Sequence, residues 1–271
     1  MPLTDLVRYF NAADSAEDSM LYLDGERAAA WHKGLRLGSL FQPIVDLRQE
    51  RVVGHQATLS ARCEDGSPVS SEEAYALCET AESVIHFDRL SRTLHALNFL
   101  AQKCHAGGYL QLAIHPRHLQ AVQSQHGLVY EAILKRCGLA PADIVLEINA
   151  RQVGHQASLG QALNNYRQRG YRLALSDFSS TPDLDGLLAL QPNILKLQPE
   201  GGREGLDVAS SAGIATELSG IETGQDFVLA CTAGMDFGQG SLFGLPQADC
   251  LPTHSRHRVA YNSHSSSRVP P

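Results

Sequence analysis

Short apolar runs in this chain alternate with longer segments that have helical spacing. Eight runs have the length and composition of buried strands, and they occupy residues 41–47, 51–59, 109–116, 143–150, 171–178, 193–198, 213–220 and 236–244. Apolar residues spaced as on one face of a helix fall at residues 71–104, 127–138, 159–170 and 182–191. Strand–helix alternation over this many units predicts a parallel sheet that closes into a barrel.

The first two strands depart from this alternation. Only a short polar turn at residues 48–51 joins them, and such a connection makes an antiparallel hairpin. We therefore predict an α/β fold, a modified TIM-like (β/α) barrel with an antiparallel first strand, at residues 37–252.

Both flanks of the barrel differ from it in pattern. Helical spacing at residues 5–13 and 25–35 predicts a helical N-terminal extension, residues 1–36. Residues 253–271 are rich in Ser, His and Arg and poor in apolar residues, so we expect a disordered tail. The first residues lack the features of a signal peptide, and we expect a cytoplasmic protein.

Composition limits the partners. Apolar residues make up 43% of the chain, enough for a substantial core, and the formal net charge is -7. This charge argues against nucleic acid or an anionic membrane as a partner, and no apolar run has the length of a membrane span. His115 and His118 lie three residues apart, with no third ligand nearby in the sequence, so we expect no metal site there.

The segment LALSDFSS, residues 173–180, contains a candidate functional residue. It reads as a buried strand that ends at Asp177. The carboxyl end of a parallel strand is where an α/β barrel places its functional groups. A single carboxylate does little alone, so its neighbours at the other strand ends matter.

Those strand ends, in order, resemble a known family. The segments are FQPIVDL, GHQATLSAR, LQLAIHPRHL, VLEINA, LALSDFSS, ILKLQ, ELSGIET and GQGSLFGLP. Together they resemble the EAL domain, a family of bacterial phosphodiesterases that hydrolyse cyclic di-GMP, over roughly residues 37–252. The resemblance implies a barrel with an antiparallel first strand. It also implies two divalent cations, usually Mg²⁺ or Mn²⁺, which activate a water molecule in active members.

The resemblance places part of the family's active site on matching residues. Glu147, Asp177, Lys196 and Glu222 are retained, although we interpret them as vestigial, with Lys196 paired to a carboxylate. The candidates for contacts with cyclic di-GMP are Gln42, Pro43, Gln56, Asp177, Gln239, Gly240 and Pro246.

Other family positions are changed. The Glu, Leu and Arg of the signature motif fall on Gln56, Thr58 and Ser60. The remaining replaced positions are Ala113 for an Asn, Ser176 for the first Asp of a pair, Gln198 for an Asp and Ser219 for a Glu. Of five metal positions only Glu147 and Asp177 can ionise, so we expect no bound metal, no cofactor and no catalysis.

The crossover after Lys196 is shorter than the resemblance implies. Gly201, Gly202 and Gly205 break its first half, and only residues 204–211 have helical potential. We expect one thinned helical unit, in which the outer helix is short. Apolar surface near residues 199–213 would then be uncovered, and a protein partner or a second copy of the chain could bind there.

Three functions remain open. The first is a non-catalytic regulator in cyclic di-GMP-related signalling that acts through protein contacts. The second is a receptor that binds cyclic di-GMP without cleaving it, and the loss of the Arg at Ser60 speaks against it. The third, an active phosphodiesterase, is disfavoured by the missing metal ligands. The sequence does not identify a protein partner.

Overall fold

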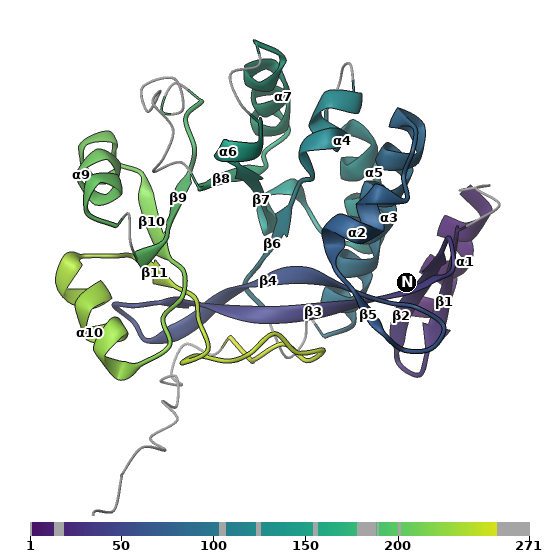
Figure 1. Cartoon of the computed structure of the whole chain (residues 1–271), viewed down its shortest axis with the longest axis horizontal. Helices are drawn as coiled ribbons and strands as arrows, with labels where there is room; N and C mark the ends of the chain where they lie inside the picture. Colours follow the sequence, from purple (N-terminus) through teal and green to yellow (C-terminus); the bar gives the residue numbers. More distant parts are fainter. Residues whose placement is uncertain are drawn as a thin grey trace, which may run out of the picture.

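The computed structural model describes residues 2–13, 19–102, 107–122, 126–153, 157–177, 188, 190–199 and 202–253. Its centre is a closed barrel with helices on the outside (Figure 1). The barrel strands are β3 (Leu35–Asp46), β4 (Arg51–Arg62), β6 (Tyr109–Ala113), β7 (Ile144–Asn149), β8 (Arg172–Ser176), β9 (Ile194–Leu197), β10 (Ala215–Leu218) and β11 (Phe237–Gly238).

One strand of this barrel runs against the others. β3 pairs antiparallel with both β4 and β11, while β4, β6, β7, β8, β9, β10 and β11 follow one another in parallel. The prediction of a modified barrel with an antiparallel first strand is confirmed. The short strand β5 (Pro68–Val69) extends the sheet beside β4.

The helices that surround the barrel follow the predicted alternation. They are α2 (Ser71–Ala76), α3 (Ala81–Ala101), α4 (Pro116–Ala121), α5 (Leu128–Cys137), α6 (Ala150–Val153), α7 (Ala157–Gln168), α9 (Gly202–Ala212) and α10 (Gly224–Ala233), with a 3₁₀ turn at Pro141–Asp143. Capping boxes begin α2, α3 and α10. These caps separate α2 from α3, so the long apolar stretch at residues 71–104 forms two helices. Among the described residues, no helix is both long and apolar enough to cross a membrane.

The N-terminal extension is helical only in its first part. The helix α1 (Leu3–Ala13) is present, but residues 25–35 are not helical as predicted. Instead β1 (Ser19–Asp24) and β2 (Arg27–His32) form a hairpin that adds to the edge of β3 (Figure 1). The predicted boundary after residue 36 therefore falls inside β3.

Turn geometry explains this error. Gly25, Lys33 and Gly34 all have positive φ, at 61°, 47° and 77°, which a helix does not allow. Between these turns Ala28 and Ala30 are buried in a hydrophobic cluster near the N-terminus. Sheet pairing and this burial override the helix propensity of alanine.

The crossover after β9 also differs from expectation. The helix α9 has eleven residues, three more than expected, despite its glycines. Ala209 is fully buried and Leu206 packs against the barrel core, which offsets the low helix propensity of glycine. The apolar surface expected beside this crossover belongs to residues 182–191, most of which lie outside the described residues. The expected tail falls almost wholly at residues 254–271, outside the described residues.

Three histidines lie inside the protein in uncharged form. Burial lowers the pKa of His55, His95 and His118 to about 4. The His55 ring accepts a hydrogen bond from the Leu251 N–H at 3.0 Å, and His95 Nδ1 lies 2.8 Å from Ser39 Oγ. These contacts tie the C-terminal segment and the β3 strand to the rest of the fold.

We expect the protein to lose stability as the pH falls from 6.5 to 4. An unfolded histidine takes up a proton near pH 6.5, whereas the folded ones do so near pH 4, so acid favours unfolding. Each histidine contributes on the order of 3 kcal/mol at most. Urea unfolding over this pH range measures the slope, and His55→Gln should reduce it. Equal stability at both ends of the range would contradict buried neutral histidines.

Candidate functional site

A cavity of about 450 Å³ opens at the carboxyl ends of the barrel strands. Its floor consists of side chains from the ends of β4, β7, β8 and β9. Its wall consists of α2, α3 and the segment that follows β6. This is the position at which barrel folds place functional groups.

The cavity brings together about half of the predicted site residues. Those that line it are Gln56, Glu147, Asp177, Lys196 and Gln239. The replaced positions Thr58, Ala113, Ser176, Gln198 and Ser219 line it as well. These residues therefore lie together at the carboxyl ends of the barrel strands.

The other predicted residues do not line this cavity. Gln42 donates a hydrogen bond to the Gly244 carbonyl at 3.1 Å, which fastens the C-terminal segment to β3 next to the buried Pro43. Gly240 has a packing role, because an added Cβ would lie 2.0 Å from the Ile221 carbonyl oxygen. Pro246 and Glu222 are exposed.

Glu147 is the centre of the polar floor. Its Oε2 atom accepts hydrogen bonds from Gln56 at 2.7 Å and Gln111 at 3.0 Å. Gln239 in turn donates to Gln56 Oε1 at 2.7 Å, which fixes the orientation of that amide. Lys196 Nζ lies 3.2 Å from the same Glu147 oxygen. Three donors therefore converge on one carboxylate oxygen.

Lys196 has a second buried partner that the sequence analysis missed. Its Nζ also lies 3.2 Å from Glu217 Oε1, and Glu217 is fully buried on β10. Burial alone would lower the pKa of Lys196, but Glu217 and Glu147 together raise it, so the ammonium stays charged. We call this arrangement of Lys196 between Glu147 and Glu217 the lysine clamp.

The two carboxylates of the lysine clamp differ in their proton affinity. Burial would raise the pKa of Glu147, but Lys196 and the hydrogen bonds from its neighbours hold it below the ordinary value. Burial raises the pKa of Glu217, and Lys196 offsets this only in part while Glu147 adds to it.

Asp177 lies at the rim of the cavity in an unusual backbone conformation. Its φ is 53°, in the left-handed region that residues other than glycine rarely adopt. Asn149 Nδ2 donates to Asp177 Oδ2 at 2.7 Å, and this contact holds the carboxylate in place.

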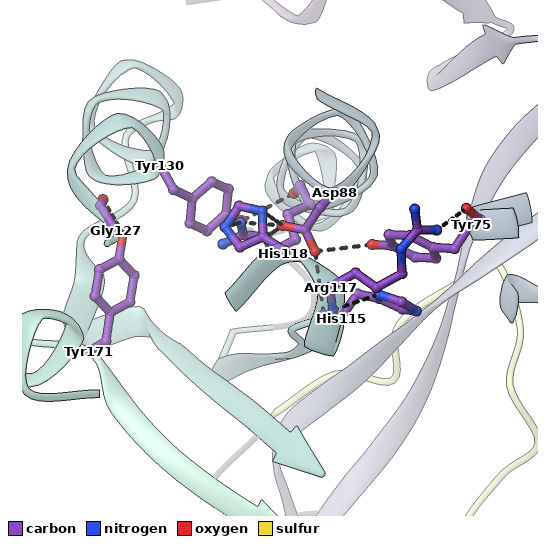
Figure 2. A network of polar contacts seen from close by, with 9 residues as sticks. Tyr75, Asp88, His115, Arg117, His118, Gly127, Tyr130 and Tyr171 are labelled. Carbon is purple, nitrogen blue, oxygen red and sulfur yellow. Dashed lines mark hydrogen bonds and ion pairs between the residues drawn. The ribbon is translucent and has the colours of Figure 1, made fainter. Parts of the chain in front are cut away.

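The wall of the cavity rests on a buried ionic network (Figure 2). Asp88 and Arg92 form a fully buried ion pair within α3, and His118 Nδ1 lies 3.2 Å from the same carboxylate. Tyr75 donates to Asp88 at 3.0 Å and stacks on His115, with ring centroids 3.8 Å apart. Burial opposes the charge on Asp88, but Arg92 holds its pKa below the ordinary value.

The donor set does not fit two divalent cations. Among the described residues, no three His, Cys, Asp or Glu side chains lie together so as to hold a metal ion. Glu147 already accepts from three donors. Of the matching positions, Ala113 supplies no side-chain oxygen and Ser176 no carboxylate. Hard cations of this kind need several oxygen ligands, of which carboxylates are the strongest.

The missed residues share one feature of the sequence. Gln111 and Glu217 are strongly polar residues inside short, mostly apolar strands, YLQLA and ATEL. In a barrel, such a position points either to the interior or to the helices, and a polar residue there marks an interior contact. Which residue each of them contacts across the barrel can be seen only in the folded structure.

Comparisons with known proteins agree with this architecture. The family model described as EAL domain matches residues 28–200. A search of curated proteins gave no match. The cAMP-bound form of the EAL enzyme Bd1971 has 20% identity and a TM-score of 0.67, covering 90% of this chain and 68% of that one.

Two further solved structures show the same fold. BlrP1 of Klebsiella pneumoniae, in a manganese and cyclic di-GMP complex, has 21% identity and a TM-score of 0.68 over 80% of this chain and 57% of its own. A standalone EAL protein of Vibrio cholerae O395, bound to cyclic di-GMP, has 21% identity and a TM-score of 0.61 over 80% and 94%.

The present chain therefore spans about two thirds of Bd1971 and less than two thirds of BlrP1. The family model matches well over half of the chain, and the barrel has the antiparallel first strand that the resemblance implies. This chain belongs to the EAL domain family.

Proposed function

We propose that this chain is a non-catalytic EAL-domain protein that acts in cyclic di-GMP-related signalling through contacts with other proteins. The observation that carries the proposal is the lysine clamp. Glu147, the retained family metal ligand on β7, is engaged by Lys196 and two glutamine amides. Glu147 Oε2 thus already has three donors from the protein itself.

The loss of carboxylates supports a lack of catalysis. Phosphodiester hydrolysis of the kind the family performs needs metal ions that lower the pKa of a water and offset the charge on phosphate. Gln56 and Ser219 line the cavity as neutral side chains where the family has acids. Lys196 supplies one positive charge, but a primary ammonium does not activate a bound water as a divalent cation does.

A receptor that binds cyclic di-GMP without hydrolysis is the alternative. Solved EAL proteins with this fold bind the nucleotide, and the cavity here is large enough to take part of one. However, Ser60, Gln42 and Gly240 do not line it. Calorimetric titration decides this point, since submicromolar affinity that depends on Gln239 would favour the receptor. A cytoplasmic location stays a prediction from the sequence.

We expect no hydrolysis of cyclic di-GMP by the purified protein with Mn²⁺ or Mg²⁺. Chromatography should recover the cyclic dinucleotide intact after incubation at high enzyme concentration. An active EAL-domain phosphodiesterase, assayed in parallel, serves as the positive control. Metal-dependent formation of the linear dinucleotide, lost in Lys196→Ala, would refute a non-catalytic role.

The lysine clamp should contribute strongly to stability. Lys196→Met leaves two buried carboxylates beside each other without a cation, and breaking a buried pair in this way costs about 3 kcal/mol or more. The double variant with Glu217→Gln should recover part of this loss, because it removes one of the two uncompensated charges. Urea unfolding of both variants measures the difference.

The pH dependence provides the control for this clamp experiment. Without Lys196, protonation of Glu147 or Glu217 relieves their repulsion, so the single variant should be less destabilised at acidic than at alkaline pH. A single variant as stable as the wild type, or a double variant no better than the single one, would contradict the clamp.

A further inference from the structure

Strand β3 has a gap along one of its two edges. On the complete edge β3 pairs with β4 over residues 36–46. On the other edge β2 pairs only with residues 35–37, and β11 pairs only with residues 45–46. Among the described residues, no named strand pairs with residues 38–44 on this second edge. The backbone groups of such an edge can accept an added strand.

A segment from far along the chain lies in this gap. Residues 244–251, which we call the strap, run alongside β3 (Figure 1). Gln247 forms an isolated antiparallel bridge with Phe41. The Phe41 N–H donates to the Gln247 carbonyl at 2.7 Å, and the Gln247 N–H donates to the Phe41 carbonyl at 3.0 Å. The strap therefore takes the place of a strand through one residue pair.

Most other hydrogen bonds to the strap reach its backbone, which every peptide has. Three side chains make them, Gln42 on β3, His55 on β4 and Gln102 at the end of α3. In the same order, they bind the Gly244 carbonyl at 3.1 Å, the Leu251 N–H at 3.0 Å, and both the Ala248 carbonyl at 3.2 Å and the Cys250 N–H at 2.8 Å. These contacts recognise main-chain groups and place few demands on the sequence that lies here.

Arg27 on β2 makes the contact that depends on sequence. Its guanidinium donates to the Ala248 carbonyl and forms an ion pair with Asp249. The side chain of Arg27 is 36% exposed and that of Asp249 is 79% exposed. A different segment in this position would have to offer a carboxylate in place of Asp249, because Arg27 otherwise loses its ion-pair partner.

Few buried side chains hold the strap along β3. Its residues 245–247 and 249 are exposed, and Leu245 is 66% exposed. Cys250 and Leu251, at its far end, are partly buried and pack against the barrel core. Segments with few buried apolar contacts open locally at a lower free energy than the core does. The strap can therefore detach while the barrel stays folded.

We propose that an extended segment of a partner protein replaces the strap and adds to β3 as a strand, with a carboxylate that pairs with Arg27. The inference rests on the proposed function and names the surface of its protein contact. Strand addition obtains affinity from main-chain hydrogen bonds and specificity from a few side chains. Here the edge at residues 38–44 provides the first and Arg27 the second. The strap is then an internal competitor that covers the edge until the partner binds.

A peptide with the sequence of the strap tests this inference. The probe is an end-capped, fluorescein-labelled peptide of residues 243–252 that carries Cys250→Ser, and fluorescence anisotropy measures its binding to the full chain. In the protein, Gln247→Pro removes the N–H that bonds to Phe41 and so weakens the protein's own strap. We expect this variant to bind the probe about fivefold more tightly than the wild type, the effect of about one hydrogen bond.

Two matched controls isolate the contacts. The protein variant Gln247→Ala keeps the backbone N–H, so it should bind the probe as weakly as the wild type does. A probe that also carries Asp249→Asn cannot pair with Arg27, and it should bind the Gln247→Pro protein about threefold more weakly at low salt, as expected for a partly exposed ion pair. Circular dichroism confirms that each protein variant is folded.

Hydrogen exchange on the wild-type protein is a second measurement, and it needs no variant. The amides of Gln247, Cys250 and Leu251 each donate to a group outside the strap. If the strap opens locally, these three amides exchange together and faster than the amides of the buried strand β7. Exchange as slow as that of β7 would overturn the inference.

Three results of the binding experiment would overturn it as well. These are equal binding of the probe by Gln247→Ala and folded Gln247→Pro, unaltered binding of the Asp249→Asn probe, or dimers of Gln247→Pro without any probe, which would identify a second copy of the chain as the occupant. The phosphodiesterase assay does not involve the strap, so any of these results together with absent hydrolysis would reject the strand exchange alone. Hydrolysis of cyclic di-GMP would reject the proposed function itself.

Discussion

A buried ammonium group must have partners, and this requirement organises the centre of the protein. Lys196 lies inside the barrel mouth with Glu147 and Glu217 each 3.2 Å from its Nζ. An unpaired charge at this depth would cost several kcal/mol or lose its proton. The pairing occupies Glu147 and leaves Asp177 as a separate carboxylate at the rim.

Much of the fold could be predicted because strand and helix periodicities are local properties of the chain. The antiparallel first strand followed from a connection too short for a crossover. Residues 25–35 could not be predicted, because three consecutive alanines favour a helix while positive φ at Gly25, Lys33 and Gly34 forms turns. The helix α9 forms despite its glycines because Leu206 and Ala209 find a packing surface on the barrel.

The candidate site was predictable to the level of strand ends and no further. Asp177 and Lys196 reach the cavity because both sit at the carboxyl ends of neighbouring parallel strands. Glu217 and Gln111 were missed, since their 3.4 Å contact crosses the barrel from β10 to β6 and depends on the register of every strand between them. Gln42 and Gly240 also fall in segments that resemble the family. Gln42, however, fastens the C-terminal segment to β3, and Gly240 packs against Ile221.

The central claim is that this cavity, with Glu147 engaged in the lysine clamp, does not bind divalent cations. Paramagnetic Mn²⁺ tests it most directly, because a bound ion broadens the NMR signals of nearby side chains without any need for turnover. The account predicts that submillimolar Mn²⁺ leaves the side-chain amide signals of Gln56, Gln111 and Asn149 as sharp as those of exposed amides such as Gln225. Selective loss of these three signals at micromolar Mn²⁺, reversed by a chelator, would contradict it.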